Sequence, residues 1–261
     1  MLSSGKSVRF VFFGTEPLAR GVLEELASAG FVPERTIEST DITPELEKKI
    51  AAQTWDVFIV ASYGKKIPKH VLDMPAHGIL NVHPSLLPRL RGPSPIRSAI
   101  LNNEKETGVS VMLLDEELDH GPLIAQKKVA VSPWPPRGSE LDDLLAHEGG
   151  KLLAAMLPLW LEGTIEARPQ NDDIATYCYA LKKEDGLLDL THDAYRNLLK
   201  IRALEGWPIA YALFERAGKK LRVQILQAHL EGNKLVIDRV KPGGKREMGY
   251  EEFLHSGARP V

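Results

Sequence analysis

The sequence predicts an α/β protein with a mostly parallel sheet and helices on both of its faces, followed by a smaller, mostly β domain. The first strands are continuous apolar runs, as expected of parallel strands that are buried on both faces. Helical stretches alternate with these runs along the chain. Toward the C-terminus the pattern changes to short β-like runs separated by glycine-containing turns, which predicts the second domain.

The chain opens with a strand, a tight turn and a helix. The run 8–13 (VRFVFF) is rich in β-forming residues, and the turn 14–17 (GTEP) leads into an apolar-periodic stretch. Pro44 after Thr43 predicts the start of a second helix, which extends to about Gln53. The other expected strands are 56–61, 78–82, 108–114 and 123–131, and the other expected helices are 18–29, 96–101 and 140–161.

The C-terminal third has a different character. Residues 163–181 lack sustained periodicity and indicate a linker, so the expected domains are 1–162 and 182–261. The second domain is expected to contain a helix at 193–204 and strands at 211–214, 221–230 and 234–240.

Composition limits the class of protein. With 261 residues and a net charge of −2, the chain has the composition of an ordinary soluble globular protein and no stretch of membrane-spanning length. The single cysteine, Cys178, excludes an internal disulfide and a multi-cysteine zinc site, and fits the reducing cytoplasm. Residues 211–261 hold ten Lys or Arg against six Asp or Glu, a local charge of +4, which suits an anionic partner or simply a solvated surface.

Two phosphate-binding patterns are incomplete. The tripeptide GKS at 5–7 precedes the first strand and lacks the upstream glycine of a phosphate loop. Gly14 lacks the two further spaced glycines of a dinucleotide fingerprint. The sequence therefore supports neither site.

Polar residues end the strand 78–82. Asn81 and His83 are two residues apart, so in an extended strand their side chains point to the same face. A neighbouring strand leads into an acidic loop that contains Asp119 and would deliver a carboxylate close to His83. A carboxylate favours the charged imidazole, and the Asn81 amide could stabilise an oxyanion.

Other interpretations of these residues stay open on spacing alone. A histidine at a strand end is more often a structural hydrogen-bonding group, and an acidic cluster is more often a solvated turn. A metal site would need a second well-spaced histidine, which the sequence does not offer.

The segment 81–126 resembles the catalytic core of the folate-dependent formyltransferases. It carries Asn-x-His, Ser-Leu-Leu-Pro, Arg-Gly, Glu-Thr-Gly-Val and a distant Asp-x-Gly, in that order. The resemblance implies a Rossmann-like sheet, a small OB-like β-barrel at the C-terminus, and 10-formyltetrahydrofolate as formyl donor without a metal. It also implies Asn81, His83 and Asp119 as the catalytic triad. The implied donor pocket comprises Ser85, Leu86, Leu87, Pro88, Lys65, Lys66, Ile67, Asp115, Glu116, Glu117 and Leu118.

The C-terminal third is similar to the methionyl-tRNA formyltransferase pattern, through IRALEGWPIAYALF at 201–214 and a tail with a Met before a short Phe-containing helix. This resemblance implies formylation of initiator methionyl-tRNA, by a cytoplasmic monomer whose C-terminal domain binds tRNA. The cations expected to meet the tRNA are Arg89, Arg91, Lys219, Lys220, Arg222, Lys241, Lys245 and Arg246.

The resemblance has gaps. Residues 30–42 are shorter than the family's basic loop, and Leu90 stands where the tRNA enzymes carry an aromatic residue. An N-formyltransferase acting on an amino sugar linked to a nucleotide is therefore the alternative. A degenerate folate- or RNA-binding module is a third interpretation, which the complete triad opposes.

Overall fold

The computed structural model describes residues 7–38 and 42–261, and the chain divides into two compact units. The first unit is built from the chain up to Pro95 together with 106–130 and 142–179, and the second from 96–105, 131–141 and 180–261. Residues 163–179, expected in a linker, thus belong to the first unit. The first two residues of the GKS tripeptide lie outside the described residues.

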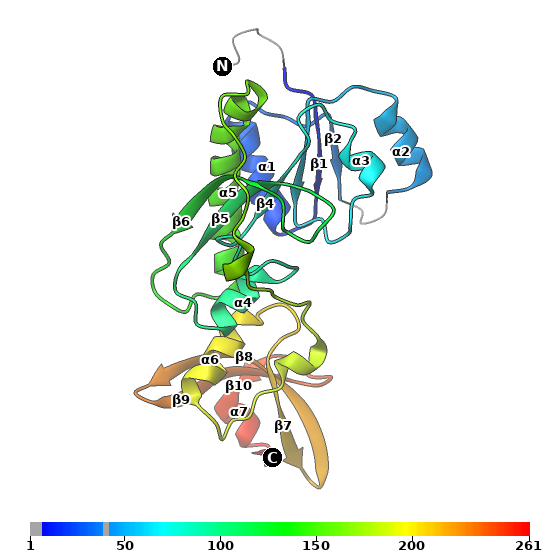
Figure 1. Ribbon diagram of the computed structural model, residues 1–261. Coiled ribbons are helices and arrows are strands. Elements are labelled where there is room, and N and C mark those ends of the chain that lie inside the picture. The colour runs from blue at the N-terminus through cyan, green and yellow to red at the C-terminus, as the bar shows by residue number, and fades with distance from the viewer. Residues whose placement is uncertain (1–6, 39–41) are drawn as a thin grey trace. The chain divides into compact units, whose positions relative to one another are not determined.

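A six-stranded sheet forms the centre of the first unit, with the order β2-β1-β3-β4-β5-β6 (Figure 1). Strands β2, β1, β3 and β4 are parallel, whereas β5 is antiparallel to β4 and β6 is antiparallel to β5. The elements of this unit are β1 (Phe10–Gly14), α1 (Leu18–Ser28), β2 (Arg35–Ile37), α2 (Pro44–Ala51), β3 (Val57–Ala61), α3 (Lys69–Leu72), β4 (Ile79–His83), β5 (Thr107–Leu113), β6 (Leu123–Val129), the long helix α5 (Gly138–Leu161), whose first residues belong to the second unit, and the 3-10 turn η1 (Asp172–Ile174).

The central strands explain the continuous apolar runs. Every residue of β1, β3 and β4 is buried, as expected of strands covered on both faces. The start of α2 is also as predicted, because the Thr43 hydroxyl accepts a hydrogen bond from the Leu46 amide at 3.3 Å, with Pro44 in the first turn.

Helices cover both faces of the sheet, which confirms the predicted α/β architecture. On one face α5 comes so close that a Cβ added at Gly149 would lie 2.5 Å from Cγ1 of Val82. On the other face Ile50 of α2 and Val71 of α3 belong to the same apolar cluster as Val60. Figure 1 shows α1 with α5 on one side and α2 with α3 on the other.

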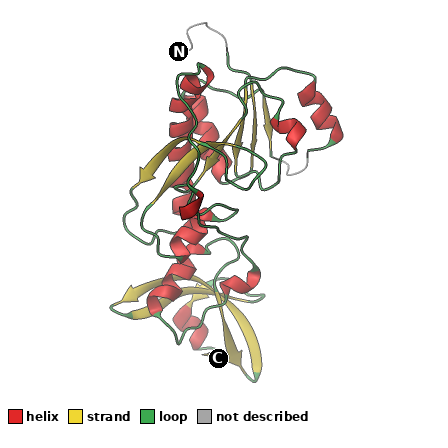
Figure 2. Ribbon diagram, in the orientation of Figure 1, coloured by secondary structure: helices red, strands yellow, loops and turns green. Residues whose placement is uncertain are grey.

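The second unit is built on a five-stranded antiparallel sheet with the order β10-β9-β8-β7-β11 (Figure 2). A separate apolar cluster joins Phe214, Val223 and Val240 of this sheet with Ile201 and Phe253 of two helices. The elements are α4 (Pro95–Leu101), η2 (Lys183–Gly186), α6 (Ala194–Ala203), β7 (Tyr211–Arg216), β8 (Lys219–Glu231), β9 (Lys234–Pro242), β10 (Met248–Gly249), α7 (Tyr250–Leu254) and β11 (Arg259–Pro260).

The OB-like barrel is not confirmed. Within the described part of the chain, the edge strands β10 and β11 pair with β9 and β7 and not with each other, so the sheet is open. In residues 7–38 and 42–261, no helix combines the length and apolar character that a membrane crossing requires.

Candidate active site

Asn81 and His83 lie at the carboxyl end of β4 and share one face of the sheet. The intervening Val82 points to α5, so the two polar side chains point to the opposite face. Asn81 is only 7% exposed and His83 only 4%. The predicted pair is therefore buried at an edge where parallel α/β sheets usually bind ligands.

Asp119 reaches His83 by a route that strand order alone does not reveal. β5 is antiparallel to β4, with Ser110 opposite His83, so β5 carries the chain away from His83. The loop 114–122 brings it back, and Asp119 within it has a positive φ of 49°. Its Oδ1 lies 3.7 Å from Nδ1 of His83, while Oδ2 accepts a hydrogen bond from the Gly92 amide at 2.7 Å.

The histidine ring is held from both sides. Nε2 of His83 lies 3.0 Å from the Leu90 carbonyl oxygen. A carbonyl only accepts hydrogen bonds, so Nε2 carries the proton and Nδ1 is the nitrogen that faces the Asp119 carboxylate. Nδ1 is thus the position at which this ring can take up or release a proton beside a negative charge.

The Asn81 amide has hydrogen-bonding capacity to spare. Its side chain makes no hydrogen bond to any residue in 7–38 or 42–261. Buried amides are normally satisfied. An Asn residue that is 7% exposed, and whose amide has no partner among the described residues, is suited to meet a ligand oxygen beside His83.

The loop 85–88 is fixed to the sheet by the buried hydroxyl of Ser110 and by the side chain of Gln126, an exposed residue of β6. The Ser110 hydroxyl donates to the Ser85 carbonyl oxygen at 2.6 Å and accepts from the Leu87 amide at 3.1 Å. Gln126 Nε2 donates to both the Leu87 carbonyl oxygen and the Ser110 hydroxyl, at 2.7 and 2.9 Å. Ser110 and Gln126 were missed by the sequence reasoning, although their strands were predicted.

The other residues predicted for the donor pocket differ in their surroundings. Lys65 and Lys66 are exposed, whereas Ile67 is buried in the core cluster with α2 and α3. Glu116 pairs with Lys69 at 2.6 Å, which joins the start of α3 to the loop after β5. Glu116, Glu117 and Leu118 are exposed, and Asp115 is half-buried.

His120 adds a titratable group to this edge. Its Nδ1 lies 2.8 Å from Oδ2 of Asp115, and Nε2 lies 3.6 Å from Oδ2 of Asp172. The hydrogen bond to Asp115 raises the pKa of His120 above its ordinary value, against a smaller opposing effect of desolvation. The sequence reasoning did not single out this residue.

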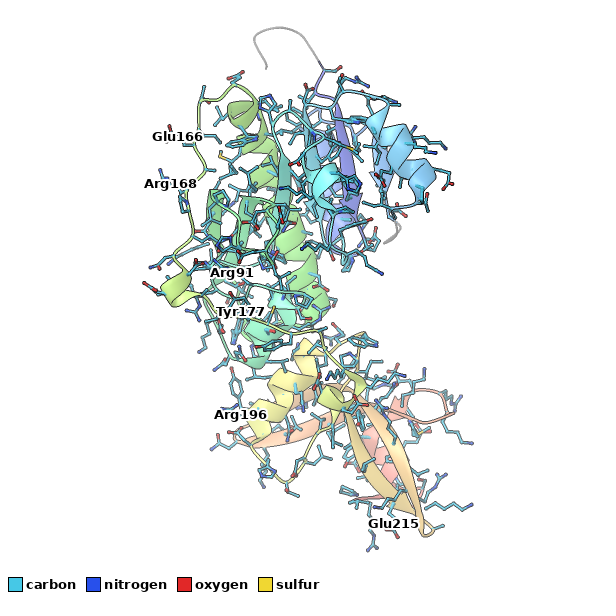
Figure 3. The ribbon with its side chains drawn as sticks, turned by 45° about the vertical axis from the view of Figure 1, so that its right-hand side comes forward. Arg91, Glu166, Arg168, Tyr177, Arg196 and Glu215 are labelled. Carbon is cyan, nitrogen blue, oxygen red and sulfur yellow. The ribbon has the colours of Figure 1, made fainter. Side chains whose placement is uncertain are left out.

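The two arginines of the 89–92 segment have different environments. Arg89 is exposed, but Arg91 is 2% exposed and donates to Gln170, Asp172 and Tyr177. The prediction that Arg91 meets tRNA is not supported, because its guanidinium is already enclosed. Figure 3 shows Arg91 next to Tyr177, within the first unit.

The other predicted cations lie on the second unit. Lys219, Lys220, Arg222, Lys241, Lys245 and Arg246 are all exposed. In β8, Val223 and Ile225 face the apolar core, so Arg222 lies on the opposite face of the sheet. The Arg222 guanidinium stacks on the ring of Tyr211 at 3.6 Å from its centroid.

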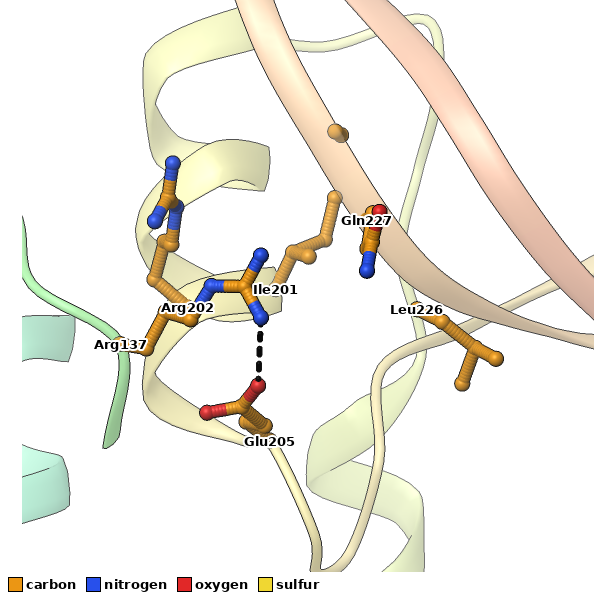
Figure 4. Close-up of a pocket in the computed structure, with 7 residues that line it drawn as sticks. Arg137, Ile201, Arg202, Glu205, Leu226 and Gln227 are labelled. Carbon is orange, nitrogen blue, oxygen red and sulfur yellow. Dashed lines mark hydrogen bonds and ion pairs between the residues drawn. The ribbon is translucent and has the colours of Figure 1, made fainter. Parts of the chain in front are cut away.

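Neither a metal-ligand group nor the pocket of the second unit includes the predicted catalytic side chains in the described part of the chain. Over residues 7–38 and 42–261, no group of three or more His, Cys, Asp or Glu side chains is placed to hold a metal ion. A shallow pocket in the second unit contains Arg137, Arg202 and Glu205, and an Arg137–Glu205 ion pair of 3.2 Å crosses it (Figure 4). This pocket contains none of the predicted catalytic side chains.

Comparison with known proteins decides the family. The model of the formyl transferase family matches residues 20–157, which is more than half of the chain. The chain belongs to the formyl transferase family. The methionyl-tRNA formyltransferase of Myxococcus xanthus is 35% identical to this formyl transferase over 254 residues, which cover 89% of the chain and 80% of the relative.

Solved structures of low identity show the same fold. The methionyl-tRNA formyltransferase from Clostridium thermocellum matches this formyl transferase with a TM-score of 0.67 at 20% identity, covering 90% of this chain and 98% of that one. HypX from Aquifex aeolicus, in complex with tetrahydrofolic acid, matches with a TM-score of 0.74 at 18% identity, covering 95% of this chain and 47% of that one.

Proposed function

We propose that this formyl transferase transfers the formyl group of 10-formyltetrahydrofolate to the α-amino group of methionyl-tRNA and so makes the initiator formylmethionyl-tRNA. The observation that carries the proposal is the buried Asn81, His83 and Asp119 set, with a carboxylate oxygen 3.7 Å from Nδ1 of His83. The Myxococcus xanthus relative, 80% of whose length is covered, supports the choice of amine.

Asn81 supplies the polar donor for the carbonyl oxygen. As the amine lone pair attacks the formyl carbon, negative charge develops on the formyl oxygen, and an amide N–H that is already oriented stabilises that charge without reorganising. The Asn81 amide, which has no side-chain hydrogen-bond partner among the described residues, fits this role. Removal of one such donor is expected to cost about 3 kcal/mol of transition-state stabilisation.

His83 and Asp119 are the residues that transfer the proton of the attacking amine. The new carbon–nitrogen bond forms first, which gives a tetrahedral intermediate, and the bond between the formyl carbon and folate N10 breaks as that intermediate collapses; one proton moves from the attacking amine to N10. Nδ1 of His83 can hold that proton between the two nitrogens, because Asp119 stabilises the imidazolium. The Leu90 carbonyl keeps the ring in place by accepting from Nε2.

The residues around this set fit a folate donor. The loop 85–88 is anchored by Ser110, which limits the entropy lost when a ligand orders it. Leu118 is 59% exposed, although large apolar side chains are usually buried, and it follows directly on Glu116 and Glu117. We assign the donor's ring system to these two loops and the 65–67 segment, with Ile67 contributing only as buried support.

The tRNA would be held through its phosphates. Lys220, Arg222 and Lys241 are exposed on β8 and β9, and Lys245 and Arg246 occupy the turn before β10. Arg89, exposed beside the active-site loop, is assigned to the acceptor end. Such contacts position RNA without reading its sequence and weaken as salt increases. We place the reaction in the cytoplasm.

The test is formyl transfer from 10-formyltetrahydrofolate to three acceptors in parallel: methionyl-tRNA, an amino sugar linked to a nucleotide, and free methionine. We expect turnover on methionyl-tRNA alone. Turnover only on the sugar nucleotide would keep the chemistry and replace the substrate, and no turnover on any amine would contradict the proposed enzyme.

A further inference from the structure

Gln170 connects the Asp119 turn to the segment that contains Arg91. Its Oε1 accepts from Nε and Nη2 of Arg91 at 3.1 and 2.8 Å. Its Nε2 donates to the carbonyl oxygens of Asp119 and Gly121 at 2.9 and 2.7 Å. The amide can take only this orientation, because guanidinium groups only donate and carbonyls only accept.

The Arg91 end of this connection is rigid. The guanidinium is 2% exposed, and it also donates to Oδ1 of Asp172 at 2.7 Å and to the Tyr177 hydroxyl at 3.4 Å (Figure 3). The backbone of Arg91 is held as well, since its amide donates to the Thr176 carbonyl oxygen and its carbonyl accepts from the Cys178 amide, at 2.9 and 2.8 Å. Gln170 therefore connects the Asp119 turn to an arginine that is itself held in place by hydrogen bonds.

The Asp119 end needs that support. Asp119 has φ of 49°, in the left-handed region that residues with a Cβ enter uncommonly, although Asp tolerates it better than most, so hydrogen bonds to the turn help to hold this shape. Its carboxylate must nevertheless keep one oxygen toward His83 and the other on the Gly92 amide. A shift of the Asp119 backbone would move both contacts together.

We infer that Gln170 is a positioning residue for the reaction, which sets the place of the Asp119 carboxylate relative to His83 by holding the carbonyls of Asp119 and Gly121. The inference rests on the proposed function for its kinetic consequence, while the geometry that it describes is independent of the acceptor. It assigns a role in the site to a segment that the sequence indicated as a linker.

The substitution Gln170→Glu tests this role with little change in volume. One carboxylate oxygen still accepts from Arg91, but the other now faces two carbonyl oxygens and repels them. The matched control is Gln53→Glu, because Gln53 is exposed on the same unit and its Oε1 also accepts from an arginine, Arg9, at 2.7 Å.

Two readouts are needed. Hydrogen exchange of the Gly92 amide, whose acceptor is Oδ2 of Asp119, is expected to speed up by about tenfold or more in Gln170→Glu and to stay unchanged in Gln53→Glu. In formyl transfer, kcat is expected to fall by about tenfold to a hundredfold while KM for each substrate changes by less than about threefold. In an Asp119→Asn background, Gln170→Glu is expected to change kcat by less than about twofold.

The outcomes separate the two claims. Unchanged Gly92 exchange, or an equal loss of kcat with and without the Asp119→Asn change, would overturn the positioning role. A wild-type protein that does not formylate methionyl-tRNA would overturn the proposed function, and the Gly92 exchange rate would then decide the inference alone.

Discussion

Ser110 holds the loop 85–88 against the sheet, so Ser110→Ala should loosen the proposed donor pocket and destabilise the protein. Ser110 is fully buried, and its hydroxyl takes part in three hydrogen bonds, with the Ser85 carbonyl, the Leu87 amide and the Gln126 side chain. Removal of the hydroxyl leaves a void smaller than a methyl group, so the lost hydrogen bonds dominate the effect.

The magnitude follows from which groups lose a partner. Gln126 Nε2 loses its hydrogen bond to Ser110 but keeps the one to the Leu87 carbonyl oxygen at 2.7 Å, so it is not left without a partner. The Ser85 carbonyl and the Leu87 amide belong to residues that are 2% and 3% exposed. A buried polar group left unsatisfied costs about 1 to 3 kcal/mol, so the two together predict a loss of about 2 to 6 kcal/mol.

Urea unfolding followed by circular dichroism measures this loss, and Ser28→Ala is the matched control. Ser28 is exposed and its hydroxyl donates to a carbonyl within its own helix, so its loss should change stability by less than about 0.5 kcal/mol. Kinetically, Ser110→Ala should raise KM for the formyl donor more than it lowers kcat. A stability equal to that of the control variant would refute the reasoning.

Three further predictions concern other parts of the structure. Gly92→Ala should destabilise by about 1 to 3 kcal/mol and lower kcat, because Gly92 has φ of 119° and a Cβ there would lie 2.2 Å from the Cys178 carbonyl oxygen; a thermal melt and an activity near those of the wild type would contradict this. The hydrogen bond to Asp115 raises the pKa of His120 above its ordinary value of 6.5 in the folded protein. The interaction of protonated His120 with Asp115 therefore stabilises the fold fully below pH 6.5, and this stabilisation is lost as the pH rises through the raised pKa of His120. The melting temperature of wild type minus that of His120→Gln should therefore fall with increasing pH, and a flat difference would disprove it. Reversing Lys245 and Arg246 to Glu should weaken tRNA binding and make it less steeply dependent on salt, while donor binding stays unchanged; the same tRNA affinity in a filter-binding assay would exclude this surface.

The strand periodicity was sufficient to place Asn81 and His83 together. An extended strand alternates its side chains, so two polar residues two apart had to share a face, and the structure has both on the face away from Val82. The boundaries of the long α5 helix and of β1, β3 and β4 were also close to those predicted, because buried runs and helix-start residues are local signals.

The approach of Asp119 depends on information that periodicity does not contain. Strand direction is not encoded in an apolar run, and β5 is antiparallel to β4, so Asp119 returns to His83 only through the path of the loop 114–122. The support from Gln170 was missed for a similar reason. Its segment is held by individual hydrogen bonds to Arg91, Asp119 and Gly121, which leave no repeating pattern in the sequence.

The C-terminal sheet shows the limit of resemblance. The strands β7, β8 and β9 were recognisable in the sequence as short β-like runs separated by glycine-containing turns, but closure depends on whether the edge strands meet. In the described residues β10 and β11 each have one neighbour, so the sheet is open where a barrel was expected. Arg91 was likewise predicted to contact tRNA from the surface, whereas the structure buries its side chain.

The measurement that most directly tests the central claim is formyl transfer to methionyl-tRNA by wild type, His83→Ala and His77→Ala. His77 is a partly exposed histidine of the same unit, just before β4, and serves as the control. We expect rapid formylation by the wild type and by His77→Ala, and a loss of at least about a hundredfold in kcat for a folded His83→Ala protein. Formylation by His83→Ala at the wild-type rate would contradict the account.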